Sequence, residues 1–138
     1  MRPPPKNSLQ DYDLIRVLGR GCMGKVFLAR DKRNKSLYAL KTIAKHRLKR
    51  DRERTHVRSE RDILATLAEA GTHPFLVSLR ASFQDKEQLY LVLDYHRGGD
   101  LAGELAKRQK FDDARVCFYA KEIVIGINEL HRLGIIYR

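Results

Sequence analysis

Three glycines and one lysine offer the clearest chemistry in the sequence. Gly19, Gly21 and Gly24 follow the spacing G-x-G-x-x-G, and Lys41 lies in an apolar run 17 residues after the last of them. Glycine lets backbone amides approach an anion closely, and a lysine on a strand can neutralise that anion from the side. The glycine motif alone also fits dinucleotide-binding folds and ordinary turns, so the surrounding elements must decide between these readings.

The elements around the glycines favour a hairpin over a dinucleotide-binding fold. Apolar runs predict strands at residues 12–18, 26–29 and 37–43, and a polar turn lies between the last two. In a dinucleotide-binding unit the glycines would open a helix, with an acidic residue about 20 positions later. Here they open another strand, and the next strand carries Lys41. The sequence therefore predicts an antiparallel glycine hairpin folded over a ligand.

A helix follows the third strand and carries a candidate partner for Lys41. Residues 45–54 are crowded with lysine and arginine, which is typical of a solvated face. From about Thr55 the spacing predicts a helix, with an apolar stripe of Val57, Ile63, Leu64 and Leu67. Glu60 lies beside that stripe and shares a face with His56. It is either a surface residue or the counter-charge that a lysine among apolar residues requires.

The rest of the chain completes an α+β lobe and begins a second, helical region. Strands are predicted at residues 76–83 and 89–93, giving five strands with one inserted helix. Residues 94–100 form a polar break that contains glycine, and helices are predicted at 101–109 and 112–133. The last helix is apolar over a wide arc, and we expect it to be short of partners that could bury it.

Composition narrows the class of protein without choosing a partner. The formal net charge of +11 favours anionic partners, including nucleotide phosphates, acidic peptides, membranes and nucleic acid. The two cysteines are isolated, which suggests neither a disulfide framework nor a zinc site. No apolar run is long enough for a transmembrane segment, and residues 1–7 lack the apolar core of a secretory signal. We therefore expect an intracellular, cytoplasmic setting.

Together these motifs resemble the first half of a protein kinase domain of the AGC group of serine/threonine kinases, similar to the cyclic-nucleotide-dependent and protein kinase C types. The match runs from about Tyr12 to Arg138. Its marks, in order, are GRGCMGKV (19–26), YALK (38–41), RSERDIL (58–64), HPFLV (73–77), LYLVLDY (89–95), GGDL (98–101) and LHRLGIIYR (130–138). The resemblance implies a flexible leader at 1–11, a kinase N-lobe at 12–93 with a five-stranded antiparallel sheet and αC helix, a hinge at 94–100, and the start of the C-lobe at 101–138.

The resemblance also implies a role for individual residues toward ATP. Lys41 would hold the α- and β-phosphates, and Glu60 would fix its position. Leu93 would guard the back of the adenine pocket, and Asp100 would reach the ribose hydroxyls. The loop over the phosphates would comprise Leu18, Gly19, Arg20, Gly21, Cys22, Met23, Gly24, Lys25 and Val26. Val26 and Ala39 would lie above the adenine ring, and the backbone of Asp94, Tyr95 and His96 would bind its edge.

Further positions carry regulatory and structural expectations. Leu64, Leu79 and Tyr137 match three of four stacked apolar residues that link the lobes of active kinases, and His56 matches a position that reaches a phosphate on the activation loop. Met23 stands where the group usually has phenylalanine, and Tyr137 stands where most kinases have histidine. The resemblance further implies a C-terminal hydrophobic segment docking beside the Glu60 helix.

The end of the chain bears on the expected activity. In the family, the aspartate that accepts the substrate hydroxyl proton and the residues that bind Mg²⁺ follow the position of Arg138. We therefore expect the ATP-binding portion of an enzyme that phosphorylates protein Ser/Thr hydroxyls, inactive as a polypeptide of these residues alone. The alternatives are a non-catalytic, pseudokinase-like nucleotide-binding module and, from charge alone, a basic nucleic-acid-binding domain, although no nucleic-acid motif is present.

Overall fold

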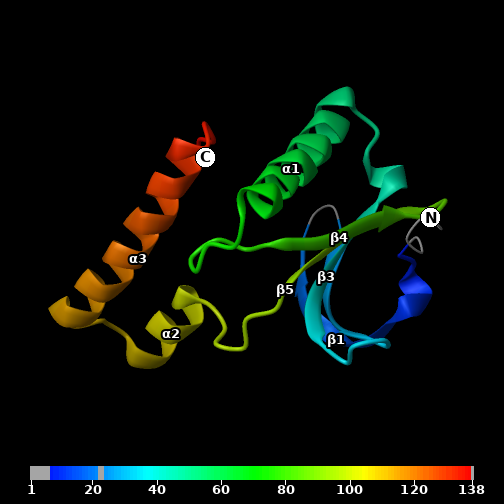
Figure 1. Cartoon of the computed structure of the whole chain (residues 1–138). Helices are drawn as coiled ribbons and strands as arrows, with labels where there is room; N and C mark the ends of the chain where they lie inside the picture. The colour runs from blue at the N-terminus through cyan, green and yellow to red at the C-terminus, as the bar shows by residue number, and fades with distance from the viewer. Residues whose placement is uncertain (1–6, 22–23, 138) are drawn as a thin grey trace. The chain divides into compact units, whose positions relative to one another are not determined.

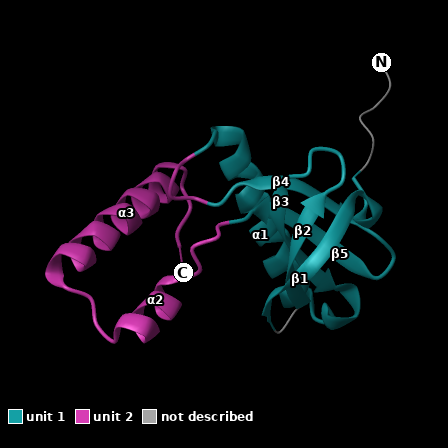
Figure 2. Cartoon of the chain, turned by 90° about the horizontal axis from the view of Figure 1, so that it is seen from below, with its two compact units in different colours: residues 1–72, 77–95 teal, residues 73–76, 96–138 magenta. Residues whose placement is uncertain are grey.

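The computed structural model describes residues 7–21 and 24–137. The chain divides into two compact units (Figure 2). Unit 1 comprises residues 1–72 and 77–95, and unit 2 comprises residues 73–76 and 96–138. The strands and the first long helix belong to unit 1, and the remaining two helices belong to unit 2.

Unit 1 is built on one five-stranded antiparallel sheet with the strand order β1-β2-β3-β5-β4 (Figure 1). Its strands are β1 (Tyr12–Arg20), β2 (Gly24–Asp31), β3 (Leu37–Ala44), β4 (Leu79–Gln84) and β5 (Gln88–Asp94). The predicted α+β fold with an antiparallel glycine hairpin is confirmed, because β1 and β2 pair directly across the glycine motif. The dinucleotide-binding alternative is excluded, since a strand and not a helix follows the glycines.

The two faces of the sheet bury two separate apolar clusters. Side chains alternate between the faces of a strand, so Leu40 and its neighbour Lys41 point to opposite sides. Leu40 belongs to a cluster with Tyr12, Ala29, Tyr90 and Val92 on one face. The other face carries Ile43 and Leu91, which pack with Leu48 and with Val57 and Leu64 of the first long helix. The sheet thus holds Lys41 on the face that this helix covers.

Helix α1 (Asp51–Ala70) begins four residues earlier than the predicted start at Thr55. The backbone N–H of Arg50 donates to the Glu53 carboxylate at 3.1 Å, and acidic side chains in the first turn favour the positive end of the helix dipole. The expected stripe is only partly confirmed: Val57, Leu64 and Leu67 are buried, but Ile63 is 38% exposed. Ile63 therefore lies outside the stripe of α1 residues that faces the sheet.

Strand β4 begins three residues later than predicted. The expected strand starts at Leu76, but the observed one starts at Leu79. Residues 73–76 instead form a turn, in which the N–H of Leu76 donates to the carbonyl of His73 at 3.2 Å. The N–H of Phe75 donates to Nδ1 of His73, also at 3.2 Å, and Pro74 has no N–H to offer a strand ladder. Apolar composition alone could not reveal these local bonds.

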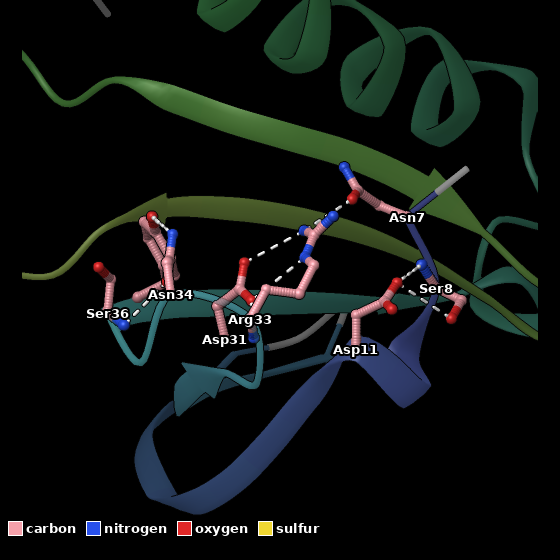
Figure 3. A network of polar contacts seen from close by, with 8 residues as sticks. Asn7, Ser8, Asp11, Asp31, Arg33, Asn34 and Ser36 are labelled. Atoms are coloured by element: carbon pink, nitrogen blue, oxygen red, sulfur yellow. Dashed lines mark hydrogen bonds and ion pairs between the residues drawn. The ribbon is translucent and has the colours of Figure 1, made fainter. Parts of the chain in front are cut away.

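A polar network ties the chain before β1 to the β2–β3 turn (Figure 3). Asp31 is buried, and its carboxylate accepts from the backbone N–H of Arg33 at 2.8 Å and from its guanidinium at 3.1 Å. These bonds to Arg33 hold the pKa of Asp31 below its usual value. The same guanidinium donates to Asn7 at 3.1 Å. Within the predicted leader, residues Leu9–Asp11 form a short 3-10 helix, and Leu9 packs against the Tyr12 cluster.

Unit 2 contains two helices whose ends follow local capping rules. Asp100 caps α2 (Leu101–Arg108) and Asp112 caps α3 (Asp113–Arg132), each accepting a backbone N–H with its carboxylate. Gly134, with φ of 73°, ends α3, and its N–H donates to the carbonyl of His131 while that of Ile135 donates to Leu130. Much of the apolar surface of α3 is exposed, at Val116, Phe118, Ile123, Val124 and Ile125.

Candidate phosphate and nucleotide site

Lys41 lies near the middle of the sheet, in a row of residues that the strand register sets side by side. Val26 of β2 and Leu91 of β5 are its direct partners on either side. Opposite residues of an antiparallel pair lie on the same face, so these two side chains flank the lysine. Ala39, two positions earlier on β3, pairs with Leu28 and Leu93 in the next row of that face. The sheet therefore brings Val26, Ala39, Lys41 and Leu93 to one surface.

Glu60 supplies the counter-charge to Lys41. Nζ of Lys41 donates to Oε1 of Glu60 at 2.6 Å, and about a third of each side chain is exposed, 31% and 32%. The distance is that of a strong charge-assisted hydrogen bond. Of the two readings of Glu60, a surface residue or a counter-charge, the structure shows the second. The ammonium is thereby held on the covered face of the sheet, with enough exposure to meet an anion.

The glycine hairpin closes through its own backbone. The N–H of Gly21 donates to the carbonyl of Gly24 at 2.9 Å, and a longer bond of 3.4 Å returns from Gly24 to Gly21. Gly19 pairs with Val26 across the hairpin. Arg20 pairs with Lys25, and both of these cationic side chains are exposed. Leu18 is half-buried. Cys22 and Met23, which the sequence analysis assigns to the same loop, lie outside the described residues.

The three glycines meet different surroundings. A Cβ atom added to Gly24 would lie 1.8 Å from the backbone carbonyl oxygen of Thr42, so β3 leaves no room for a side chain there. A Cβ at Gly19 or Gly21 would meet nothing within 4 Å. Packing against β3 thus demands the third glycine, whereas the open space at the first two leaves room for an approaching ligand.

Thr42 fastens the end of the hairpin to β3. Its buried hydroxyl donates to the carbonyl of Lys25 at 3.2 Å and accepts from the N–H of the same residue at 3.3 Å. The role of Thr42 could not be predicted from the sequence, because a threonine in a strand is an ordinary β-former. Its position next to Lys41 makes it the link between the lysine-bearing strand and the glycine hairpin.

Three hydrogen bonds to residues 78–80 hold the end of β5. Arg80 of β4 donates to both carboxylate oxygens of Asp94, from Nε at 2.6 Å and from Nη2 at 3.0 Å. The N–H of Asp94 donates to the carbonyl of Ser78 at 3.2 Å. Tyr95 follows, half-buried, and its hydroxyl lies 3.5 Å from the guanidinium of Arg16. Arg80 could not be predicted from the sequence either, since an exposed arginine on an edge strand carries no distinctive signal.

Comparison with known proteins identifies the family of this chain. Residues 12–138 match the protein kinase domain. This chain belongs to the protein kinase family. It is 42% identical to the human serine/threonine-protein kinase Sgk2 over 134 residues, which cover 97% of this chain and 36% of that protein. It is 48% identical to rat ribosomal protein S6 kinase alpha-1 over 131 residues, covering 92% of this chain and 17% of the relative.

These relatives belong to the AGC group that the motifs predict. The chain is also similar to a RAC family serine/threonine-protein kinase homolog from Dictyostelium discoideum. That protein is 41% identical over 133 residues, covering 96% of this chain and 29% of its own length. The kinase chain described here thus spans about a third or less of the length of these relatives. Both the resemblance to the AGC group and its extent along the chain are confirmed.

The remaining kinase positions lie in both units. Leu64 is buried in the same apolar cluster in which Leu79 is partly buried, whereas His56 is exposed on α1. In unit 2, His96 and Tyr137 are exposed. The Asp100 carboxylate accepts the N–H of Gly103 at 2.7 Å, which engages one of its oxygens as a helix cap. The ribose contact expected of Asp100 and the adenine contact expected of His96 stay predictions.

The described residues contain neither a metal-binding cluster nor a membrane-spanning helix. Within residues 7–21 and 24–137, no three histidine, cysteine, aspartate or glutamate side chains come together in a way that could hold a metal ion. Protein kinases use Mg²⁺ together with ATP, and the expectation that its ligands follow the position of Arg138 stays a prediction. No helix in the described part of the chain is long and apolar enough to cross a membrane.

Proposed function

We propose that this chain forms the nucleotide-binding part of a serine/threonine protein kinase, which transfers the γ-phosphate of ATP to hydroxyls of a protein substrate. The observation that carries the proposal is the 2.6 Å bond between Lys41 and Glu60 on the sheet face beside the glycine hairpin. A fixed ammonium next to accessible backbone amides is the arrangement that phosphoryl-transfer enzymes use to hold a polyphosphate. The pairing is also evidence against a degenerate, pseudokinase-like pocket.

In the proposed binding mode, different groups on the sheet bind the phosphates and the adenine of the nucleotide. The α- and β-phosphates bind the Lys41 ammonium, and the open side of the hairpin at Gly19 and Gly21 lets amides approach the phosphate oxygens. Adenine lies against Val26 and Ala39, whose side chains share the face of Lys41. Leu93 closes the far edge of that surface, and the Asp94 backbone binds the adenine edge.

Titration calorimetry with ATP tests this proposal. Wild-type protein is compared with Lys41→Met, which keeps an apolar stem and removes the charge. The control is Lys32→Met, because Lys32 pairs with Asp13 and neither residue is a strand partner of Lys41. We expect Lys41→Met to lower ATP affinity about tenfold or more, the cost of one charge-assisted bond. Equal affinity in Lys41→Met and wild type would overturn the proposal.

A second part of the proposal concerns turnover. A polypeptide of these 138 residues contains the nucleotide-binding groups but not the residues that the family uses to accept the hydroxyl proton and to bind Mg²⁺. We therefore expect it to bind ATP without phosphorylating a basic peptide substrate. Robust turnover by the purified polypeptide in a radiometric assay would contradict this expectation.

An intracellular setting also stays a prediction, resting on the isolated cysteines and the family.

A groove in unit 1 fits the docking segment that the resemblance implies. It has a volume of about 570 Å³ and lies between α1 and strands β4 and β5. Its apolar lining includes Leu48, Val57 and Leu89, and its basic lining includes Arg54 and Arg58. The charge of this lining suits an acidic or phosphorylated hydrophobic segment.

A fluorescent peptide with two phenylalanines flanked by acidic residues tests this docking site. We expect Arg58→Ala to weaken peptide binding, and the effect to shrink in high salt. An acidic peptide without the phenylalanines serves as the control for charge alone. Equal binding of the two peptides would contradict an apolar docking groove.

A further inference from the structure

Arg80 and Asp94 form an ion pair at the last residue of β5. The guanidinium donates to both oxygens of the carboxylate, at 2.6 and 3.0 Å, in the fork geometry that fixes orientation as well as distance. The arginine side chain is 46% exposed and the aspartate side chain 24%. An exposed pair of this kind contributes little to stability. Its geometry nevertheless restrains the residue at which the strand becomes the predicted hinge.

The backbone of Asp94 is restrained from the same side. Its N–H donates to the carbonyl of Ser78 at 3.2 Å, just before β4 begins. Asp94 stands opposite Tyr38 of β3, but its N–H donates to Ser78 and not to β3. The amide is therefore engaged, and the carbonyl is the group of Asp94 that can accept the amino group of adenine.

We propose that Arg80 is a positioning residue of the nucleotide site, which holds the Asp94 carbonyl where it accepts a hydrogen bond from adenine. This inference rests on the nucleotide-binding function proposed above and assigns Arg80 no contact with the nucleotide itself. Two attachments, one to the side chain of Asp94 and one to its N–H, hold the Cα atom from which the carbonyl extends. Without the arginine only the single bond to Ser78 remains, and the carbonyl direction is less defined.

The position of Arg80 predicts a selective effect. Adenine binding depends on the Asp94 carbonyl, whereas phosphate binding depends on Lys41 and the glycine hairpin. Among the described residues, Arg80 has no hydrogen bond or ion pair with either of these. A positioning role therefore weakens ATP more than an inorganic polyphosphate. A merely structural role, acting through a loosened sheet, would weaken both ligands together.

The experiment measures the affinities of the full chain for ATP and for inorganic tripolyphosphate by calorimetry. The variants are Arg80→Ala, which removes the fork, and Arg80→Lys, which keeps the charge without it. Lys32→Ala is the matched control, because its side chain is 48% exposed and its ion pair with Asp13 does not involve Asp94. Circular dichroism and thermal unfolding establish that each variant is folded.

We expect Arg80→Ala to lower ATP affinity about three- to fivefold, the range of one exposed ion pair, and to leave tripolyphosphate affinity unchanged. Arg80→Lys should recover part of the loss, and Lys32→Ala should match wild type. Unchanged ATP affinity in Arg80→Ala, or equal losses for both ligands, would overturn the role of Arg80 alone. Failure of the wild-type protein to bind ATP at all would instead overturn the proposed function.

Discussion

Lys41 and Glu60 are 19 positions apart in the sequence and lie on different elements, yet Nζ of Lys41 is 2.6 Å from Oε1 of Glu60. Strand β3 carries the lysine and helix α1 carries the glutamate. Both elements are labelled in Figure 1. About a third of each side chain is exposed, so the pair adds little to the free energy of folding. Its main physical effect is to hold the ammonium in one place.

Glu60→Gln separates this positioning effect from stability. The amide keeps the size of the side chain but loses the charge that holds Lys41. We expect the free energy of unfolding to change by less than about 1 kcal/mol, while ATP affinity falls several-fold. Urea unfolding and calorimetry measure the two quantities. Asp62→Asn, which removes an exposed carboxylate from the same helix, should change neither; a matching fall in ATP affinity there would argue against a specific role for Glu60.

The glycines of the hairpin should respond differently to alanine. At Gly24 the added methyl group would lie 1.8 Å from the carbonyl oxygen of Thr42, so β2 or β3 must shift. We expect Gly24→Ala to lower the free energy of unfolding by about 1–3 kcal/mol, the usual cost of overpacking. Gly21→Ala is the matched control, because nothing lies within 4 Å of its added atom. It should leave stability within about 0.5 kcal/mol of wild type. Equal stability losses in the two variants would contradict the packing role of Gly24.

The β4–β5 turn should confer a measurable pH dependence at alkaline pH. Tyr90 is buried and donates its hydroxyl hydrogen to Asp85 at 2.7 Å. Burial and the hydrogen bond to Asp85 raise the pKa of Tyr90 from 10.0 to about 12. Because the folded state keeps the proton longer than the unfolded state, this contribution is complete below pH 10 and is lost as pH rises toward 12.

Comparison of wild type with Tyr90→Phe isolates that titration. At neutral pH we expect the variant to be less stable by about 1 kcal/mol, the net worth of one hydrogen bond. Above pH 10 the difference should shrink, because only the wild type has a phenol to ionise. Denaturant unfolding from pH 7 to 11 measures both. A stability difference that stays constant over this range would show that the phenol titrates normally.

The exposed apolar face of α3 should make a polypeptide of these residues self-associate. Phe118 is 57% and Val124 is 63% exposed on this helix. Exposed apolar surface of this kind favours association in water. We expect Val124→Glu to shift the sedimentation distribution toward monomer. Asn128→Glu adds the same charge at an exposed polar position of α3 and should shift it less; equal shifts would mean that charge alone controls association.

Much of the site could be predicted from the sequence because its determinants are local. The glycine spacing and the alternating strands place the hairpin and Lys41 correctly, and helical spacing puts Glu60 beside the buried stripe of α1. The cap of α3 at Asp112 and its end at Gly134 follow from residue types alone.

The errors and omissions arise where non-local or competing contacts decide. The predicted strand start at Leu76 is wrong because residues 73–76 form a hydrogen-bonded turn. The predicted start of α1 is too late because the Glu53 carboxylate accepts the N–H of Arg50 and begins the helix earlier. The bonds of Arg80 to Asp94 cross between strands, and no spacing in one sequence reveals such a pair.

The most direct test of the account is the chemical reactivity of Lys41 with and without ATP. Acylation of each lysine is followed by mass spectrometry while ATP is added, with the exposed Lys32 as an internal reference. If nucleotide phosphates bind the ammonium of Lys41, ATP should slow acylation of Lys41 selectively and leave Lys32 unchanged. Acylation of Lys41 at the same rate with saturating ATP as without it would contradict the central claim.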